Sequence, residues 1–127
     1  MQSLVKLANE KVIVRELQLA DSIWGRFWGL LPRKGLEPGE GLLLTPCRGI
    51  HTFFMRFSID ALYLDDQMRV VAVFPEVKPW RLLPYLKEAR QVLEVASGAV
   101  SALGVEVGDQ LLLQNNTRCW ESAGGRA

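Results

Sequence analysis

The stretch CRGIHTFFMRFSIDALYLDD, from Cys47 to Asp66, holds the only histidine of the chain and several other side chains able to do chemistry. Cys47, His51 and Asp60 could supply a thiol nucleophile, a base and an orienting acid. His51 and Asp60 have opposite parity, so a continuous strand would point them to opposite faces unless a bulge or bend intervened. A small hydrolase or transferase that uses Cys47 or His51 is therefore an alternative function.

Cys47 and His51 also resemble a pair of metal ligands. Zinc takes three or four protein ligands, and after these two the chain offers only Cys119 and carboxylates. In an extended segment the two donors would lie about 13 Å apart, although a turn at Gly49 could bring them closer. We predict no metal and no cofactor. The two cysteines, Cys47 and Cys119, are too few for a disulfide framework.

Asp60 is the most informative single residue. Aspartate is disfavoured in strands, yet Asp60 stands between Ile59 and Ala61 in an apolar run, and a buried carboxylate needs partners. Arg56 shares its parity but would be about 13 Å away on one straight strand. Asp60 is either a structural hydrogen-bond hub or a ligand contact, and we favour the hub.

If a ligand binds, we expect it near residues 47–51, with a loop over residues 78–85 beside it. Arg56 and His51 would donate hydrogen bonds to an anionic or carbonyl group, Trp80 would stack, and Asp60 would orient the donors. The predicted ligand-binding residues are His51, Arg56, Asp60, Trp80 and Arg81.

Charge gives little reason to expect nucleic acid. The net charge is +1, with 15 basic and 14 acidic residues, so no global field attracts a polyanion. Basic residues do fall near predicted loops, and Trp80 and Tyr85 lie among them, which keeps single-stranded nucleic-acid binding as a second alternative. These basic residues are Arg33, Lys34, Arg48, Arg56, Lys78, Arg81, Lys87 and Arg90. The partner is unknown; a small anionic ligand or a protein fits best.

Apolar alternation and turn residues predict strands over most of the chain. We expect strands at residues 11–19, 41–45, 51–57, 59–64, 68–74, 91–96 and 110–114. Asp65-Asp66-Gln67 supplies a turn that makes a hairpin of residues 59–74, and residues 75–84, with three prolines, read as a loop.

Two short helices complete the prediction. Apolar residues recur at helical spacing over residues 22–31, and Ser97 can cap a helix over residues 99–103 that Gly104 ends. The fold class is mainly β (α+β), a single compact antiparallel barrel or sandwich of about seven or eight strands with a helix packed against it. We expect one domain over residues 1–127, folded over about 11–114, with a flexible tail at 115–127.

The N-terminal sequence mixes charge into every few residues and has no apolar block of signal-peptide length. The chain also lacks a run of eighteen apolar residues, so no membrane span is expected. A cytoplasmic location is the default expectation.

Several motifs in order resemble the family named domain of unknown function 192. They include Gly39-Glu40-Gly41-Leu42, Pro46-Cys47, Ile50 to Phe53, Met55 to Phe57, Ile59-Asp60, Pro79-Trp80-Arg81 and Gly108-Asp109, with Gly29-Leu30 before them. The resemblance runs from about Val12 to Leu113.

The resemblance implies a compact β-rich fold and no established activity. Two positions depart from the family's compact bacterial branch: Phe54 stands where glycine is frequent, and Ser58 where proline is frequent. A glycine would allow close approach of a ligand that Phe54 would block. We expect a non-enzymatic binding or accessory module whose partner is unknown.

Overall fold

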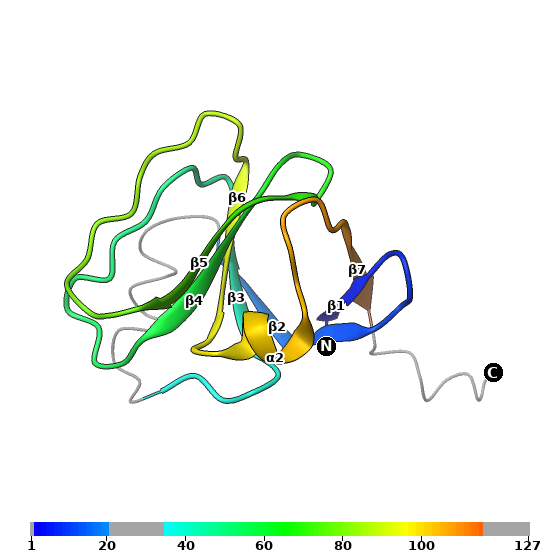
Figure 1. The fold of residues 1–127 in the computed structure, drawn as a ribbon, viewed down its shortest axis with the longest axis horizontal. Coiled ribbons are helices and arrows are strands. Elements are labelled where there is room, and N and C mark those ends of the chain that lie inside the picture. Colours follow the sequence, from blue (N-terminus) through cyan, green and yellow to red (C-terminus); the bar gives the residue numbers. More distant parts are fainter. Residues whose placement is uncertain (1, 21–34, 116–127) are drawn as a thin grey trace.

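The structure, a computed structural model, describes residues 2–20 and 35–115. These residues form seven strands and one short helix, as Figure 1 shows. The elements are β1 (Gln2–Lys6), β2 (Val12–Ala20), β3 (Glu40–Leu44), β4 (Ile59–Leu64), β5 (Val70–Val77), β6 (Gln91–Ala96), α2 (Ala99–Leu103) and β7 (Leu111–Asn115).

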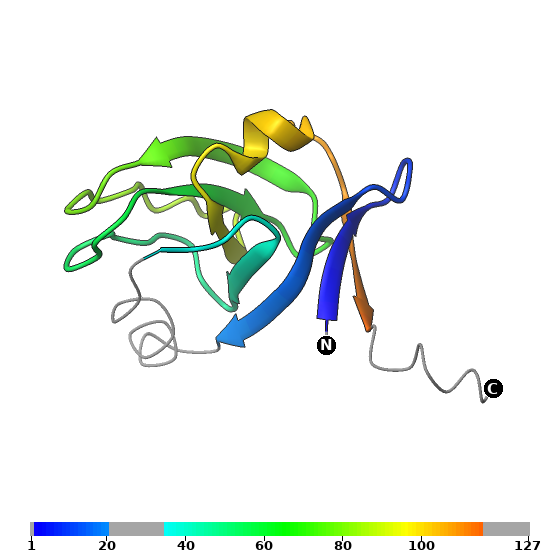
Figure 2. The same ribbon diagram turned by 90° about the horizontal axis from the view of Figure 1, so that it is seen from below.

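The strands form one curled sheet in the order β5-β4-β6-β3-β2-β1-β7. All neighbours are antiparallel except β2 and β3, which pair in parallel. The edge strands β5 and β7 meet only near the isolated bridge between Arg69 and Gln110, so the sheet is an open half-barrel (Figure 2). The expected antiparallel barrel or sandwich is therefore wrong in its closure and in the β2–β3 pair, while the β-rich class is confirmed.

Most predicted elements are found close to their expected positions. β4, β6 and α2 have the predicted bounds, and β4 and β5 form the predicted hairpin. β1 was not predicted, because its apolar run, Leu4-Val5, is only two residues long and lies between Ser3 and Lys6. β5 continues through Pro75 to Val77, where a loop was expected. Proline is tolerated there because β5 lies at the edge of the sheet, where the missing N–H removes no ladder bond on its outer side.

Both faces of the sheet carry a hydrophobic core. On one face, Leu62, Leu64 and Leu93 pack with Val100 of α2 and Val105. The opposite face has another set of sheet residues, covered by residues from the segments after β3 and after β5; its buried members are Leu42, Leu44, Ile50, Met55, Ile59, Ala61, Tyr63, Val77, Ala89 and Val92. All six residues of β4 are buried, as expected for a strand covered on both sides.

One helix, α2, lies within the described residues, where two short helices were predicted. The other predicted helix, expected over residues 22–31, falls outside the described residues. Arg33, Lys34, Cys119 and the tail from residue 116 also lie outside them. Gly104 ends α2 as predicted, in the left-handed conformation at φ 70°, which glycine adopts without strain. Gly98 rather than Ser97 is the N-cap, and no side chain of the cap residue bonds to the helix.

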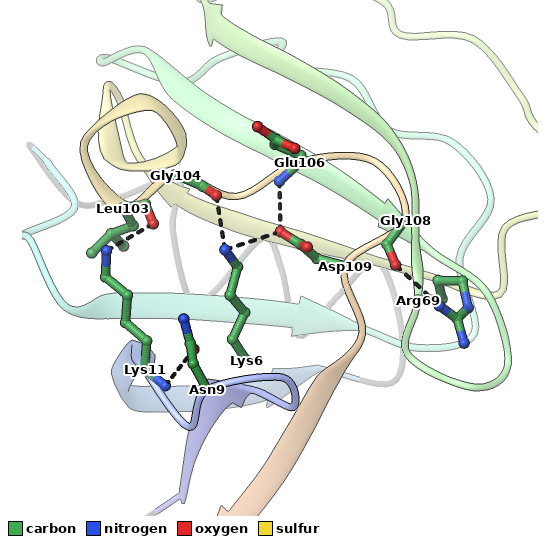
Figure 3. Close-up of polar contacts among 9 residues, drawn as sticks. All are labelled: Lys6, Asn9, Lys11, Arg69, Leu103, Gly104, Glu106, Gly108 and Asp109. Carbon is green, nitrogen blue, oxygen red and sulfur yellow. Dashed lines mark hydrogen bonds and ion pairs between the residues drawn. The ribbon is translucent and has the colours of Figure 1, made fainter.

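Lysines of the β1–β2 hairpin hold the C-terminal end of α2 (Figure 3). The Lys6 ammonium donates to the Gly104 carbonyl at 3.0 Å and lies 3.3 Å from the Asp109 carboxylate, and the Lys11 ammonium donates to the Leu103 carbonyl at 3.0 Å. Carbonyls at a helix C-terminus lack partners within the helix, so these contacts satisfy them and place cations at the negative end of the dipole. The chain's first hairpin is thereby joined to the segment that leads to β7.

No helix in the described part of the chain has the length and apolar character needed to cross a membrane. The cytoplasmic location stays a prediction.

Candidate ligand-binding site

Two irregular segments run side by side at the end of the sheet away from β7 (Figure 1). We call them the first loop (residues 45–58) and the second loop (residues 78–90). Backbone hydrogen bonds of 2.8 to 3.0 Å join them at intervals, from the amides of Cys47, Thr52, Leu83 and Leu86 to the carbonyls of Arg90, Arg81, Ile50 and Arg48 respectively. Side chains on the two loops therefore have fixed relative positions.

Gly49 lies where the loops approach most closely. A Cβ atom at this position would stand 3.2 Å from the Pro84 carbonyl oxygen and 3.3 Å from the Tyr85 Cα, closer than nearly all real contacts of that kind. The glycine of the Cys-Arg-Gly-Ile-His motif is therefore explained by backbone packing.

Thr52 joins the loops through its side chain as well as its backbone. Its hydroxyl donates to the Lys78 carbonyl at 2.7 Å and accepts the Arg81 amide at 2.8 Å, while its carbonyl accepts the Trp80 amide at 2.9 Å. The side chain is completely buried. Thr52 thus brings Trp80 and Arg81 next to His51, which bridges Leu82 across the loops.

The first loop is not the strand predicted for residues 51–57. His51 makes an isolated bridge, and the Met55 amide returns to the Thr52 carbonyl in a turn at 3.2 Å. Thr52 and Met55 are buried while Phe54 is 65% exposed. The apolar alternation of the sequence therefore falls on a turn in which Thr52 and Met55 are buried, and not on a pleated strand.

Four rings from the two loops form a continuous row, which we call the aromatic row (His51, Phe53, Phe54 and Trp80). Ring centroids are 4.7 Å apart between His51 and Phe53, 5.9 Å between Phe53 and Trp80, and 4.7 Å between Phe54 and Trp80. Phe54 and Trp80 are both more than half exposed. The row is a surface on which a planar or apolar group could stack.

Phe54 and Trp80 both have a left-handed backbone conformation, at φ 69° and 66°. This conformation is strained for bulky side chains, and it persists only where the surrounding structure imposes it. Glycine, which the resemblance to the family leads us to expect at position 54, would adopt this conformation without strain. The conformation of this turn therefore suits glycine, independently of any effect on ligand access.

His51 is oriented by its own loop. Its Nδ1 accepts the Phe53 amide at 3.2 Å, so in the neutral ring the N–H donor is Nε2. Arg56 and Arg81 are exposed, and within the described residues Arg56 makes no hydrogen bond or ion pair, whereas Arg81 Nη1 donates only a long bond to the Pro79 carbonyl at 3.4 Å. Among the predicted ligand-binding residues, the structure brings together His51, Trp80 and Arg81.

Asp60 lies elsewhere, beneath α2. Its buried carboxylate accepts the amides of Glu76 at 2.7 Å, of Gly98 at 3.1 Å and of Val100 at 2.9 Å. It points to the face that carries α2, whereas Cys47 packs with the core of the opposite face. The structure therefore does not assemble Cys47, His51 and Asp60 into a triad, and it shows no Arg56–Asp60 pair.

Cys47 and Tyr63 lie under the two loops. The half-buried Cys47 thiol donates to the Gly49 carbonyl at 3.1 Å, and the Tyr63 hydroxyl donates to the Pro84 carbonyl at 2.7 Å. Burial, with a smaller contribution from the nearby Cys47, raises the pKa of Tyr63 to about 12. Tyr63 was not singled out from the sequence; its one signal was a hydroxyl inside the apolar run Ile59–Leu64.

Within the described ranges, no group of three or more histidine, cysteine, aspartate or glutamate side chains could hold a metal ion. The side-chain donors that the site offers are guanidinium groups and one imidazole. Such donors suit an anionic or carbonyl-bearing ligand.

The open half-barrel and the two loops packed on it are the fold of a small β-rich protein. Residues 4–113 match the family DUF192, described as "Uncharacterized ACR", and the chain belongs to that family. The resemblance seen in its motifs is thereby confirmed.

Relatives of the chain carry names that assign no activity. It is 33% identical over 111 residues to the UPF0127 protein of Pyrococcus furiosus, covering 85% of this chain and 95% of the relative. It is 35% identical over 114 residues to the UPF0127 protein of Pyrococcus abyssi, covering 83% and 94%. A crystal structure of a protein of unknown function from Novosphingobium aromaticivorans has a similar fold, with a TM-score of 0.73, 21% identity, and coverage of 87% of this chain and 82% of the other.

Proposed function

We propose that the chain is a non-enzymatic binding module that holds a planar ligand on its aromatic row. The supporting observation is the row itself, in which exposed rings from two loops are fixed by the buried Thr52. Two strained aromatic residues are maintained at the surface, where they contribute little to the core.

Polar groups beside the aromatic row indicate that the ligand also carries a hydrogen-bond acceptor. His51 Nε2 and the guanidinium of Arg81 would donate to a carbonyl or anionic substituent of the ligand. Arg56, which lies on the first loop with His51, would add a third donor. The ligand is then a planar group that carries a carbonyl or an oxyanion. Asp60 contributes indirectly in this proposal, because its carboxylate is fully used by backbone amides of the fold.

Fragment screening by ¹H–¹⁵N correlation NMR tests this function. We expect planar heterocycles with carbonyl or carboxyl substituents to shift the amides of residues 51–54 and 80–81. Trp80→Ala should weaken binding by about tenfold or more, since stacking on one ring contributes about 1–3 kcal/mol. Val107→Ala, which also removes exposed apolar surface but lies in the segment before β7, is the matched control.

Two results would count against the proposal. Fragments that bind without shifting these amides, or equally well in Trp80→Ala and the control, would place the ligand elsewhere. Binding only to a short oligothymidylate would favour the second candidate, single-stranded nucleic acid, for which stacked rings beside exposed cations are also suited.

A further inference from the structure

A separate cleft lies between the two loops, beyond the aromatic row. Its volume is about 440 Å³, and its lining includes Pro46, Cys47, Arg48, Tyr85 and Arg90. This is within the size range of sites that hold small molecules. The charged side chains among the described lining residues are both arginines.

The arginines come from different loops, and backbone hydrogen bonds join their positions in the chain. The Cys47 amide donates to the Arg90 carbonyl at 2.8 Å, and the Leu86 amide donates to the Arg48 carbonyl at 2.9 Å. The close approach at Gly49 brings the same two segments together. The walls of the cleft are thus set by backbone contacts on both sides.

The Arg48 side chain is held by one hydrogen bond. Its Nε donates to the Ala89 carbonyl at 2.8 Å. A guanidinium has five N–H donors, so the four on the two Nη atoms are not used by that bond. The Arg90 side chain makes no hydrogen bond or ion pair within residues 2–20 and 35–115. With respect to residues 2–20 and 35–115, both arginines therefore have donors available to a ligand.

Two guanidinium groups that share a cleft with no carboxylate among its described lining repel each other. An oxyanion placed between them removes the repulsion and accepts paired N–H bonds from each. The cleft is larger than one oxyanion requires, and the ring of Tyr85, 69% exposed, and Pro46 supply apolar walls. The complementary ligand has an oxyanion joined to a ring-sized apolar part.

We propose that this cleft is an organic-anion site, in which Arg48 and Arg90 hold the oxyanion and Tyr85 stacks on the attached ring. The site uses residues outside the aromatic row, so it goes beyond the function proposed above and stands or fails separately. The oxyanion can be a phosphate or a carboxylate, because guanidinium pairs with both in the same way.

NMR titration with phenyl phosphate, benzoate, inorganic phosphate and benzyl alcohol tests the site. We expect phenyl phosphate or benzoate to shift the amides of Cys47, Arg48, Tyr85 and Arg90. Comparison of these two probes shows which oxyanion the site takes. Inorganic phosphate, which lacks the ring, and benzyl alcohol, which lacks the charge, should each bind at least tenfold more weakly than the better of them.

Arg90→Gln and Arg48→Gln should each weaken that binding about tenfold or more. Lys87→Gln is the matched control, since it removes one positive charge from the same loop at an exposed residue outside the cleft lining. Because Arg48→Gln also removes the bond to Ala89, Arg90→Gln is the decisive variant.

Three results would overturn the inference: no probe binds, benzyl alcohol binds as tightly as the anions, or Lys87→Gln weakens binding as much as Arg90→Gln. Shifts confined to residues 51–54 and 80–81 would also overturn it while supporting the aromatic row. Failure of one site is therefore distinguishable from failure of the other.

Discussion

Asp60 joins two parts of the molecule at one carboxylate. One oxygen accepts the amide of Glu76, where β5 departs from regular pairing with β4, and both oxygens bind amides at the start of α2. Glu76 has φ 52°, so its amide is turned out of the strand ladder toward Asp60. The carboxylate replaces the capping side chain that Gly98 lacks.

Asp60→Asn should reduce the free energy of unfolding by about 2–4 kcal/mol. The amide nitrogen would present a donor to backbone donors, and a buried N–H would lose its acceptor. Urea unfolding measures the change. Asp66→Asn, an exposed change in the adjacent turn, should shift stability by less than about 0.5 kcal/mol. Equal effects at the two positions would show that the buried bonds contribute nothing.

At the residue scale the sequence identified Asp60 but not its partners. A carboxylate between Ile59 and Ala61 had to be satisfied, and the preferred interpretation as a hub is the arrangement that the structure displays. The partners are backbone amides of Glu76, Gly98 and Val100, and an amide has no side-chain signature in a sequence. The sequence analysis expected the loop that carries Trp80 to lie beside His51. Nothing in the sequence indicated that Thr52 would join the two loops.

At the scale of elements, regular strands were predictable and the loops were not. β4 and β6 are buried runs that are apolar apart from Asp60 in β4 and Gln91 and Glu94 in β6. Polar turns bound both runs, so the sequence pattern determines their limits. Residues 51–57 show the alternation of a half-buried strand, yet two hydrogen bonds of Thr52 and a left-handed Phe54 make this segment a turn. Periodicity cannot separate these cases, because the deciding bonds come from the second loop.

A comparison of glycine and alanine at position 54 measures the strain of that turn. Phe54→Gly should be more stable than Phe54→Ala by about 1 kcal/mol, since only the alanine is held at an unfavourable positive φ. Thermal or urea unfolding gives the difference, and both variants lose the same ring.

The same pair of substitutions at Phe53 is the control. Phe53 has no positive φ, so alanine should there be the more stable of the two by about 0.5–1 kcal/mol. The same order of stability at both positions would mean that Phe54 is not strained.

At the scale of the whole molecule, the sheet separates two coverings, with α2 on one face and the two loops on the other. Tyr63 crosses from the sheet to the second loop through its bond to the Pro84 carbonyl. The pattern of apolar runs and turn residues predicted the β-rich class, but the open sheet depends on where the last strand pairs. β7 pairs with β1, a strand that the sequence did not predict, and this is why closure was predicted wrongly.

Stability should fall as pH rises from 10 to 12, in part because of Tyr63. The native pKa is about 12 and the ordinary value is 10.0, so the unfolded chain loses the phenol proton first. The contribution of Tyr63 to the free energy of unfolding is therefore fully present below pH 10. It decreases toward pH 12, by at most about 1.4 kcal/mol per pH unit. Urea unfolding over this range measures the slope.

Tyr63→Phe should lower stability at neutral pH by about 1 kcal/mol through the lost bond to Pro84, and it should lessen the fall above pH 10. Tyr85→Phe, the same deletion on an exposed ring, should leave the fall intact. If the difference in unfolding free energy between wild type and Tyr63→Phe stays constant up to pH 12, the buried phenol does not cause the fall in stability.

The pairing of β1 with β7 has a consequence for the order of folding. Gln2 lies opposite Asn115, so one edge of β1 remains uncovered until almost all of the described chain has been synthesised. The contacts of Lys6 with Gly104 and Asp109 must wait equally long. Because bringing distant segments together is entropically costly and slow, we expect the β1–β7 ladder to form late, with this edge of Leu4 and Val5 unpaired until β7 is available.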